Sequence, residues 1–206
     1  MEKSIPYFKQ PDDTHCFQAC LKMVLKYFFP EKDFTYEELD KISDKQRDKW
    51  SWLGAAAIQL KKMGLKTKAY SNFDYNEFVK NGDDYIRKKY SKEVAEKTIK
   101  NTIIESEIEN AKEMLKENIY ELKEMSFKDI EKLFGENYVM ILLVNSEMMN
   151  ERPGFEGHFV VITGIDHSNV YVNDPSRIDG SPNKKVEKDL FIKSWDYQKL
   201  VILIKK

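Results

Sequence analysis

The stretch that decides the fold is Gln10–Phe28, with the sequence QPDDTHCFQACLKMVLKYF. From Cys16 onward it carries apolar residues on most sides, which predicts a buried helix over Cys16–Phe28 that Pro30 ends. A cysteine at a helix start lies beside unpaired backbone N–H groups and the positive end of the helix dipole, and both favour a thiolate. The stretch therefore predicts a central helix of the core and, in Cys16, a nucleophilic thiol.

The residues just before this helix are turn and cap formers. Asp13 and Thr14 are expected to accept hydrogen bonds from the first N–H groups of the helix. Six residues before the thiol, Gln10 is placed to bring its side-chain amide alongside the backbone N–H of Cys16. Two donors aimed at one point form an oxyanion hole, so Gln10 is the candidate oxyanion donor.

The rest of the chain supplies further helices and then a sheet. Thr35 and Glu38 form a capping pattern that predicts a short helix, and apolar periodicity predicts another over 51–63 before a strand at 65–70. Near-continuous apolar runs predict buried strands at Tyr138–Asn145, His158–Ile165, Val170–Asp174 and Leu200–Ile204. Helices followed by a mostly antiparallel sheet predict an α+β fold, with the Cys16 helix packed on the sheet.

The 206 residues are expected to form a single domain, 1–206, with a charged helical insertion at about 74–135. Lys and Glu dominate this segment while apolar residues recur at helical spacing, which predicts two to four amphipathic helices. The simpler interpretation is a solvated insertion packed by one apolar stripe. The alternative is a cover beside the active site or a contact surface for a protein partner.

Charge and hydropathy exclude several classes of protein. Lys and Arg (34) nearly balance Asp and Glu (35), so no basic excess indicates nucleic-acid binding. No secretory signal and no apolar run long enough to span a membrane is present, which predicts a cytoplasmic protein that does not contact membranes. The only cysteines, Cys16 and Cys20, are four residues apart in one helix, a poor spacing for a disulfide.

A thiol nucleophile needs a base, and the chain has three histidines. His158 stands at the start of a buried strand and is the candidate base, whereas His167 lies in a turn. If Asp166, His167 and Ser168 form a three-residue loop, Asp174 points to the same side as His158 and can orient its ring. A loop with an even number of residues would turn Asp174 to the other face of the sheet.

Each of these residues also has an ordinary structural explanation. A cysteine on an apolar helix is usually a small buried hydrophobe, which is the role expected of Cys20. An Asp-Pro after a strand, as at Asp174, is usually a turn signal. His15, Cys16 and Cys20 have suitable ligand types for a metal, but structural zinc takes four ligands, so no metal and no cofactor is expected. The combination of Gln10, Cys16, His158 and Asp174 in compatible places favours the catalytic interpretation.

Three blocks together resemble the C39-like cysteine peptidases, a branch of the papain-like fold. The blocks are IPYFKQPDDTHCFQACLKMVLKYF, GHFVVITGIDHSNVYVNDP and FIKSWDYQKLVILI. They cover both ends of the chain and leave the 74–135 insertion unmatched. By position, the resemblance implies Cys16 as nucleophile, His158 as general base and acid, Asp174 as orienting residue and Gln10 as oxyanion donor.

The sequence departs from the family beside the nucleophile. The family commonly has Gly-Pro after the cysteine, whereas Phe17 and Gln18 follow Cys16 here. The main hypothesis is a thiol-dependent hydrolase that cleaves a peptide or small amide through a thioester. One alternative is an acyltransferase with the same residues. The other is an inactive peptide-binding module in which Phe17 blocks the site.

Overall fold

The computed structural model describes residues 1–206. The helices are α1 (Cys16–Phe28), α2 (Tyr36–Ile42), α3 (Leu53–Lys62), α4 (Tyr75–Lys89), α5 (Lys92–Lys100), α6 (Ile104–Lys116), α7 (Phe127–Gly135), α8 (Ser146–Met149) and α9 (Lys188–Trp195). The strands are β1 (Lys66–Ser71), β2 (Tyr120–Leu122), β3 (Val139–Asn145), β4 (Gly157–Ile165), β5 (Asn169–Asn173), β6 (Lys184–Glu187) and β7 (Val201–Lys205). They form one seven-stranded sheet in the order β2-β1-β7-β3-β4-β5-β6, and β1–β2 is its one parallel pair.

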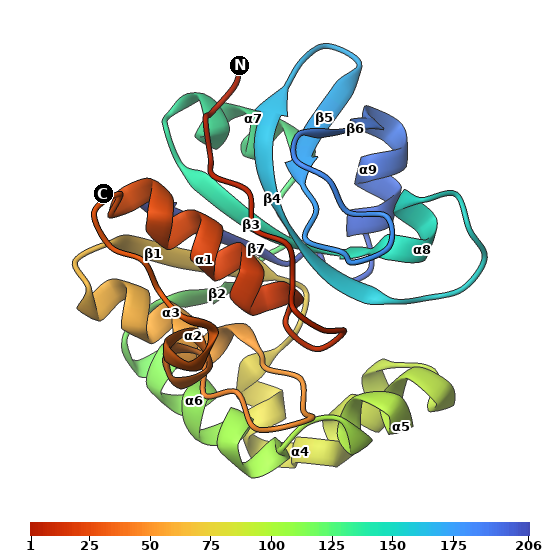
Figure 1. Ribbon diagram of the computed structural model, residues 1–206. Coiled ribbons are helices and arrows are strands. Elements are labelled where there is room, and N and C mark those ends of the chain that lie inside the picture. Colours follow the sequence, from red (N-terminus) through yellow and green to blue (C-terminus); the bar gives the residue numbers. More distant parts are fainter.

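Helices cover both faces of this sheet (Figure 1). On one face, Phe159 and Val161 of β4 lie in the larger core with residues of α1, α3, α4 and α6. On the other face, Val160 and Ile162 lie in a second core with residues of α7 and α9. This alternation follows from the period of two in a strand and explains why the predicted strands are apolar throughout. The predicted α+β fold, with the Cys16 helix packed on a mostly antiparallel sheet, is confirmed.

Local sequence patterns set the boundaries of several helices. α1 spans Cys16–Phe28 as expected, and most of its side chains are buried. The Thr35 side chain accepts from the backbone N–H of Glu38, whose carboxylate accepts in return from the backbone of Thr35. Ser126 and Asp129 form the same reciprocal pair at the start of α7. Such caps satisfy helix donors within four residues of sequence, which is why sequence patterns predict them.

The hairpin between β4 and β5 differs from the expected one in its pairing at the turn and in a β-bulge. Near the turn, Ile165 pairs with Val170, so the expected three-residue loop is wrong by one residue. A β-bulge between Ile162 and Gly164 then shifts the register, and Val161 pairs with Asn173, which is the register expected near the site. Because a bulge inserts one unpaired residue, it cancels the effect of the turn, and Asp174 still faces His158.

The structure also contains two strands that the sequence analysis did not predict. β2 lies inside the 74–135 segment and pairs with β1, so this segment is not helical throughout. β6 pairs with β5 and forms the other edge of the sheet. Both are short edge strands with a single buried residue each, Tyr120 and Val186, so neither has the apolar pattern that identifies a strand.

The longest apolar helices of the chain fall short of a membrane span. No helix combines enough length with enough hydropathy to cross a bilayer.

Candidate active site

Cys16 is the first residue of α1, and the residue as a whole is partly buried. His15 precedes it at the cap position, and no side chain caps the helix. The expected capping by Asp13 or Thr14 is therefore wrong. The physical reason is that Asp12 forms a tight turn first: its Oδ1 accepts from the backbone N–H of Thr14 at 2.8 Å, and His15 Nδ1 lies 2.7 Å away. No side chain before α1 therefore caps its first N–H groups.

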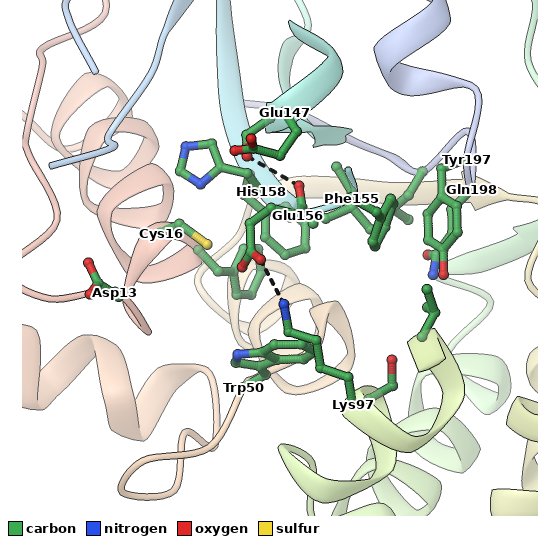
Figure 2. Close-up of a pocket in the computed structure, with 18 of the residues that line it drawn as sticks. Asp13, Cys16, Trp50, Lys97, Glu147, Phe155, Glu156, His158, Tyr197 and Gln198 are labelled. Carbon is green, nitrogen blue, oxygen red and sulfur yellow. Dashed lines mark hydrogen bonds and ion pairs between the residues drawn. The ribbon is translucent and has the colours of Figure 1, made fainter. Parts of the chain in front are cut away.

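His158 lies beside this thiol, at the start of β4 (Figure 2). Its Nε2 lies 2.8 Å from Oδ1 of Asp174, which leaves Nδ1 as the ring nitrogen available to the sulfur. The exposed side-chain fractions are 9% for His158 and 0% for Asp174. The backbone N–H of Ser176 also donates to Asp174 Oδ1, at 3.0 Å. The structure therefore holds the carboxylate firmly and brings Cys16, His158 and Asp174 together.

Cys16, His158 and Asp174 shift one another's pKa values. Burial by itself raises the pKa of the Cys16 thiol, but the interaction with His158 and backbone N–H groups of Phe159 and Phe17 outweigh burial, so the pKa falls below its usual value. Burial lowers the pKa of His158, while Asp174 and Cys16 outweigh it and raise that pKa to about 10. Burial opposes ionisation of Asp174, yet His158 dominates and holds the pKa of that carboxyl well below its usual range. The lowered pKa of Cys16 and the raised pKa of His158 both favour the thiolate–imidazolium form of the pair.

Gln10 reaches the same site from the segment before α1. Its side chain is almost fully buried and lines the pocket that contains Cys16. Its Nε2 donates to the carbonyl of Asp12 at 2.8 Å, and its backbone N–H donates to the carbonyl of Pro175, the residue after Asp174, at 3.0 Å. One of the two amide hydrogens is thus used to fix the side chain, and the second remains for a ligand.

A pocket of about 630 Å³ opens beside the thiol (Figure 2). One wall comes from the loop before His158, and the opposite wall includes Trp50 and residues of α5 within the charged segment. Lys97 of α5 forms an ion pair with Glu156 at 2.8 Å, which joins the two walls in front of Trp50. The charged segment therefore forms part of the pocket, as the cover interpretation of the insertion expects. The alternative role of this segment, as a contact surface for a partner protein, stays a prediction.

Phe17 does not stand over the thiol. Its side chain is 2% exposed and packs against Phe159, with ring centroids 4.6 Å apart. Gln18 is also buried, and its Nε2 donates to the hydroxyls of Ser43 at 2.7 Å and Ser51 at 2.5 Å. The two residues that replace the family's Gly-Pro are therefore accommodated in the interior, and the pocket beside Cys16 stays open.

The remaining sequence candidates lie apart from the catalytic geometry. Cys20 is fully buried, and burial raises the pKa of its thiol well above the usual value. His15 turns toward the carboxylates of Asp12 and Asp40. His167 is exposed in the β4–β5 turn. These positions agree with the structural roles expected of Cys20 and His167.

One charged residue at the site was not predicted from the sequence. Lys184, on the unpredicted strand β6, places its Nζ 3.0 Å from Asp174 Oδ2. It is one lysine among many in a charged stretch, and no local pattern distinguishes it from the exposed Lys185 beside it. Only the pairing of β6 with β5 brings it to the carboxylate.

Comparison with known proteins agrees with this fold. The profile of the Peptidase C39 like family matches residues 2–201, a range that includes the charged segment. No curated protein sequence matches the chain.

Several solved structures have a similar fold. A double glycine motif protease from an AMS/PCAT transporter, in complex with its leader peptide, has a TM-score of 0.52 at 17% identity, covering 99% of this chain and 93% of that chain. The peptidase domain of Streptococcus ComA, a bifunctional ABC transporter of a quorum-sensing pathway, has a TM-score of 0.52 at 14% identity, with 97% and 96% covered. A C39-like peptidase from Bacillus anthracis has a TM-score of 0.55 at 15% identity, with 98% and 95% covered. At these identities the likeness shows the fold alone.

Proposed function

The chain belongs to the Peptidase C39 like family, and from this premise we propose that it is a cysteine peptidase that hydrolyses a peptide bond at Cys16. The observation that carries the proposal is the arrangement of His158, held at 2.8 Å by buried Asp174, beside a thiol at the start of a helix. A base oriented by a third group next to a nucleophile is the signature of covalent acyl chemistry.

The proposed reaction has two halves. The Cys16 thiolate attacks the carbonyl carbon of the scissile bond, and the resulting oxyanion accepts hydrogen bonds from the backbone N–H of Cys16 and the side-chain amide of Gln10. The imidazolium of His158 then gives its proton to the leaving amine as the C–N bond breaks, and a thioester on Cys16 remains. Neutral His158 takes a proton from water, whose oxygen attacks the thioester. The acid product leaves and the thiolate–imidazolium pair returns.

Hydrolysis of peptides in water enriched with ¹⁸O tests this proposal. The protein is incubated with a peptide mixture, and new carboxyl ends are sought by mass spectrometry. Cleavage that adds one ¹⁸O to each new carboxyl end, and that is absent with Cys16→Ala, supports a hydrolase. Products joined to an added amine, without ¹⁸O, would instead support the acyltransferase. If neither product forms although the Cys16 thiol is reactive, the proposal of peptide hydrolysis is contradicted.

Gln10→Ala is expected to lower kcat about a hundredfold to a thousandfold, because one of two oxyanion donors is lost in the transition state. The alkylation rate of Cys16 by iodoacetamide should stay near the wild-type rate, since Gln10 is not part of the thiolate–imidazolium pair. Gln46→Ala, at an exposed glutamine, is the matched control. A kcat within about threefold of wild type for Gln10→Ala would exclude this role.

The pH dependence of kcat/KM is expected to be bell-shaped. The reactive form needs a thiolate, which appears as the pH rises through the lowered pKa of Cys16. It also needs the imidazolium proton, which is lost as the pH rises through the raised pKa of His158, about 10. Activity should therefore be high at neutral pH and fall toward pH 10. A rate that rises in one step near the pKa of an ordinary thiol would contradict the ion pair.

A further inference from the structure

Lys184 occupies a central position behind the catalytic histidine. Its Nζ donates to Asp174 Oδ2 at 3.0 Å, to Asn150 Oδ1 at 2.6 Å and to the carbonyl of Asp179 at 3.1 Å. Its side chain is 18% exposed, so water screens these contacts only in part. All three donor hydrogens of the ammonium are used.

The two oxygens of Asp174 consequently serve different partners. Oδ1 lies 2.8 Å from His158 Nε2 and accepts from the backbone N–H of Ser176, while Oδ2 accepts from Lys184. The carboxylate is fully buried, and its single negative charge is shared between two cations, the imidazolium and the ammonium. Any charge that Lys184 neutralises is not available to hold the proton on His158.

The sharing of the Asp174 charge between His158 and Lys184 affects the step in which the leaving amine is protonated. An imidazolium held by both a thiolate and an unshared carboxylate is a poor acid, because its proton is stabilised from two sides. The leaving amine must nevertheless receive that proton from His158. We propose that Lys184 is a positioning residue that fixes Asp174 and shares its charge, so that the imidazolium of His158 releases its proton more readily to the leaving amine. The inference rests on the proposed peptidase function.

Lys184 also joins the two loops on either side of His158. Asn150 follows α8, and Asp179 lies in the loop between β5 and β6, so the ammonium connects both to the carboxylate. Arg152 joins the same loops from outside, with contacts of 2.7 Å to Asp179 and to Glu147. Lys184 thus shares the charge of Asp174 and, together with Arg152, holds the loops that surround it.

Few other charged or titratable groups act on this pair. The groups next to His158 and Asp174 are Cys16 and Cys20 on α1, Tyr7 on the N-terminal segment and Lys184 on β6. Lys184 is the one cation among them. Its removal is therefore expected to change the proton affinity of His158 without another cation to compensate.

Histidine NMR measures this effect directly, because the chain has only three histidines. The ¹⁵N-histidine-labelled chain carries Cys16→Ser, which removes the thiolate and so brings the titration of His158 to a lower pH. In this background Lys184→Met should raise the pKa of His158 by roughly one unit, since a nearby positive charge is lost. Lys184→Arg keeps the charge and should restore the pKa. Lys185→Met, at the exposed neighbour, is the matched control.

Lys184→Gln provides a second variant if Lys184→Met fails to fold. Glutamine keeps a donor for Asp174 Oδ2 but carries no charge, so the pKa of His158 should again rise. A pKa that stays unchanged or falls with either neutral variant would overturn the inference, because a merely structural lysine would at most loosen Asp174 and lower that pKa.

A kinetic comparison separates this inference from the proposed function. With Lys184→Met, kcat/KM for peptide cleavage should fall about tenfold, while alkylation of Cys16 at pH 7 should stay within about twofold of wild type. Alkylation needs only a thiolate, whereas turnover needs the proton of His158. If the wild-type chain cleaved no peptide, the peptidase proposal would fail while the NMR titration would still decide whether Lys184 acts on His158.

Discussion

Cys16→Ala is expected to lower turnover by roughly a millionfold, because the variant has no atom that forms the thioester. The loss should leave the fold intact. Cys16 is partly exposed at the start of α1, and alanine favours helix more than cysteine does. The measurement is kcat/KM for a cleaved peptide, together with circular dichroism and a thermal unfolding curve for the same sample.

Cys20→Ala is the matched control for this substitution. It removes the same sulfur one helical turn further along α1, where the side chain is fully buried. The expected result is the opposite one: activity is kept, and the free energy of unfolding falls because a small cavity is left in the core. Full activity of Cys16→Ala would refute the covalent mechanism, and inactivity of a folded Cys20→Ala would show that the thiol at position 16 alone does not account for the reaction.

The parts of the fold that the sequence predicts are those that neighbouring residues decide. α1 begins and ends where its apolar pattern and Pro30 place it, and Thr35 with Glu38 starts α2 as the capping pattern requires. The strands β3, β4, β5 and β7 were also predicted, because burial on both faces makes each a continuous apolar run.

The parts that the sequence did not predict depend on partners far away along the chain. β6 is a strand because it pairs with β5, and its own residues KKVE give no strand pattern. The bulge at Thr163 is supported from the N-terminus, where the backbone N–H of Lys3 donates to the carbonyl of Thr163 at 2.7 Å. Neither feature leaves a signal in a single sequence, since the pairing that causes it is not local.

The candidate site shows the same division. Cys16 is recognisable from its place at a helix start, and His158 from its place at a strand start. Asp174 meets His158 only in the right register, and two deviations from the expected hairpin, the shifted pairing at the turn and the bulge, cancel to give that register. Lys184 could not be predicted, because only the assembled sheet brings it to the site. That the insertion adds a wall to the pocket was one of the alternatives for this segment, but the sequence did not indicate that α5 forms it.

His158→Gln is expected to remove both turnover and the reactivity of the thiol. The base that activates water and protonates the leaving amine is gone, so turnover should fall about as far as with Cys16→Ala, and the double variant should be no slower than either single one. His167→Gln, at the exposed turn, is the matched control and should behave as wild type.

The alkylation rate of Cys16 in the His158→Gln variant shows which part of the molecule makes the thiol reactive. Burial raises the pKa of Cys16, and His158 is the main group that lowers it. Without the imidazole, the backbone N–H groups of Phe159 and Phe17 and the start of α1 are left to oppose burial. We expect that they do not suffice, so that the thiol is mostly protonated at pH 7 and iodoacetamide alkylates it about a hundredfold more slowly than in the wild type. If iodoacetamide alkylated Cys16 in His158→Gln at the wild-type rate, the helix start alone would be shown to sustain the thiolate.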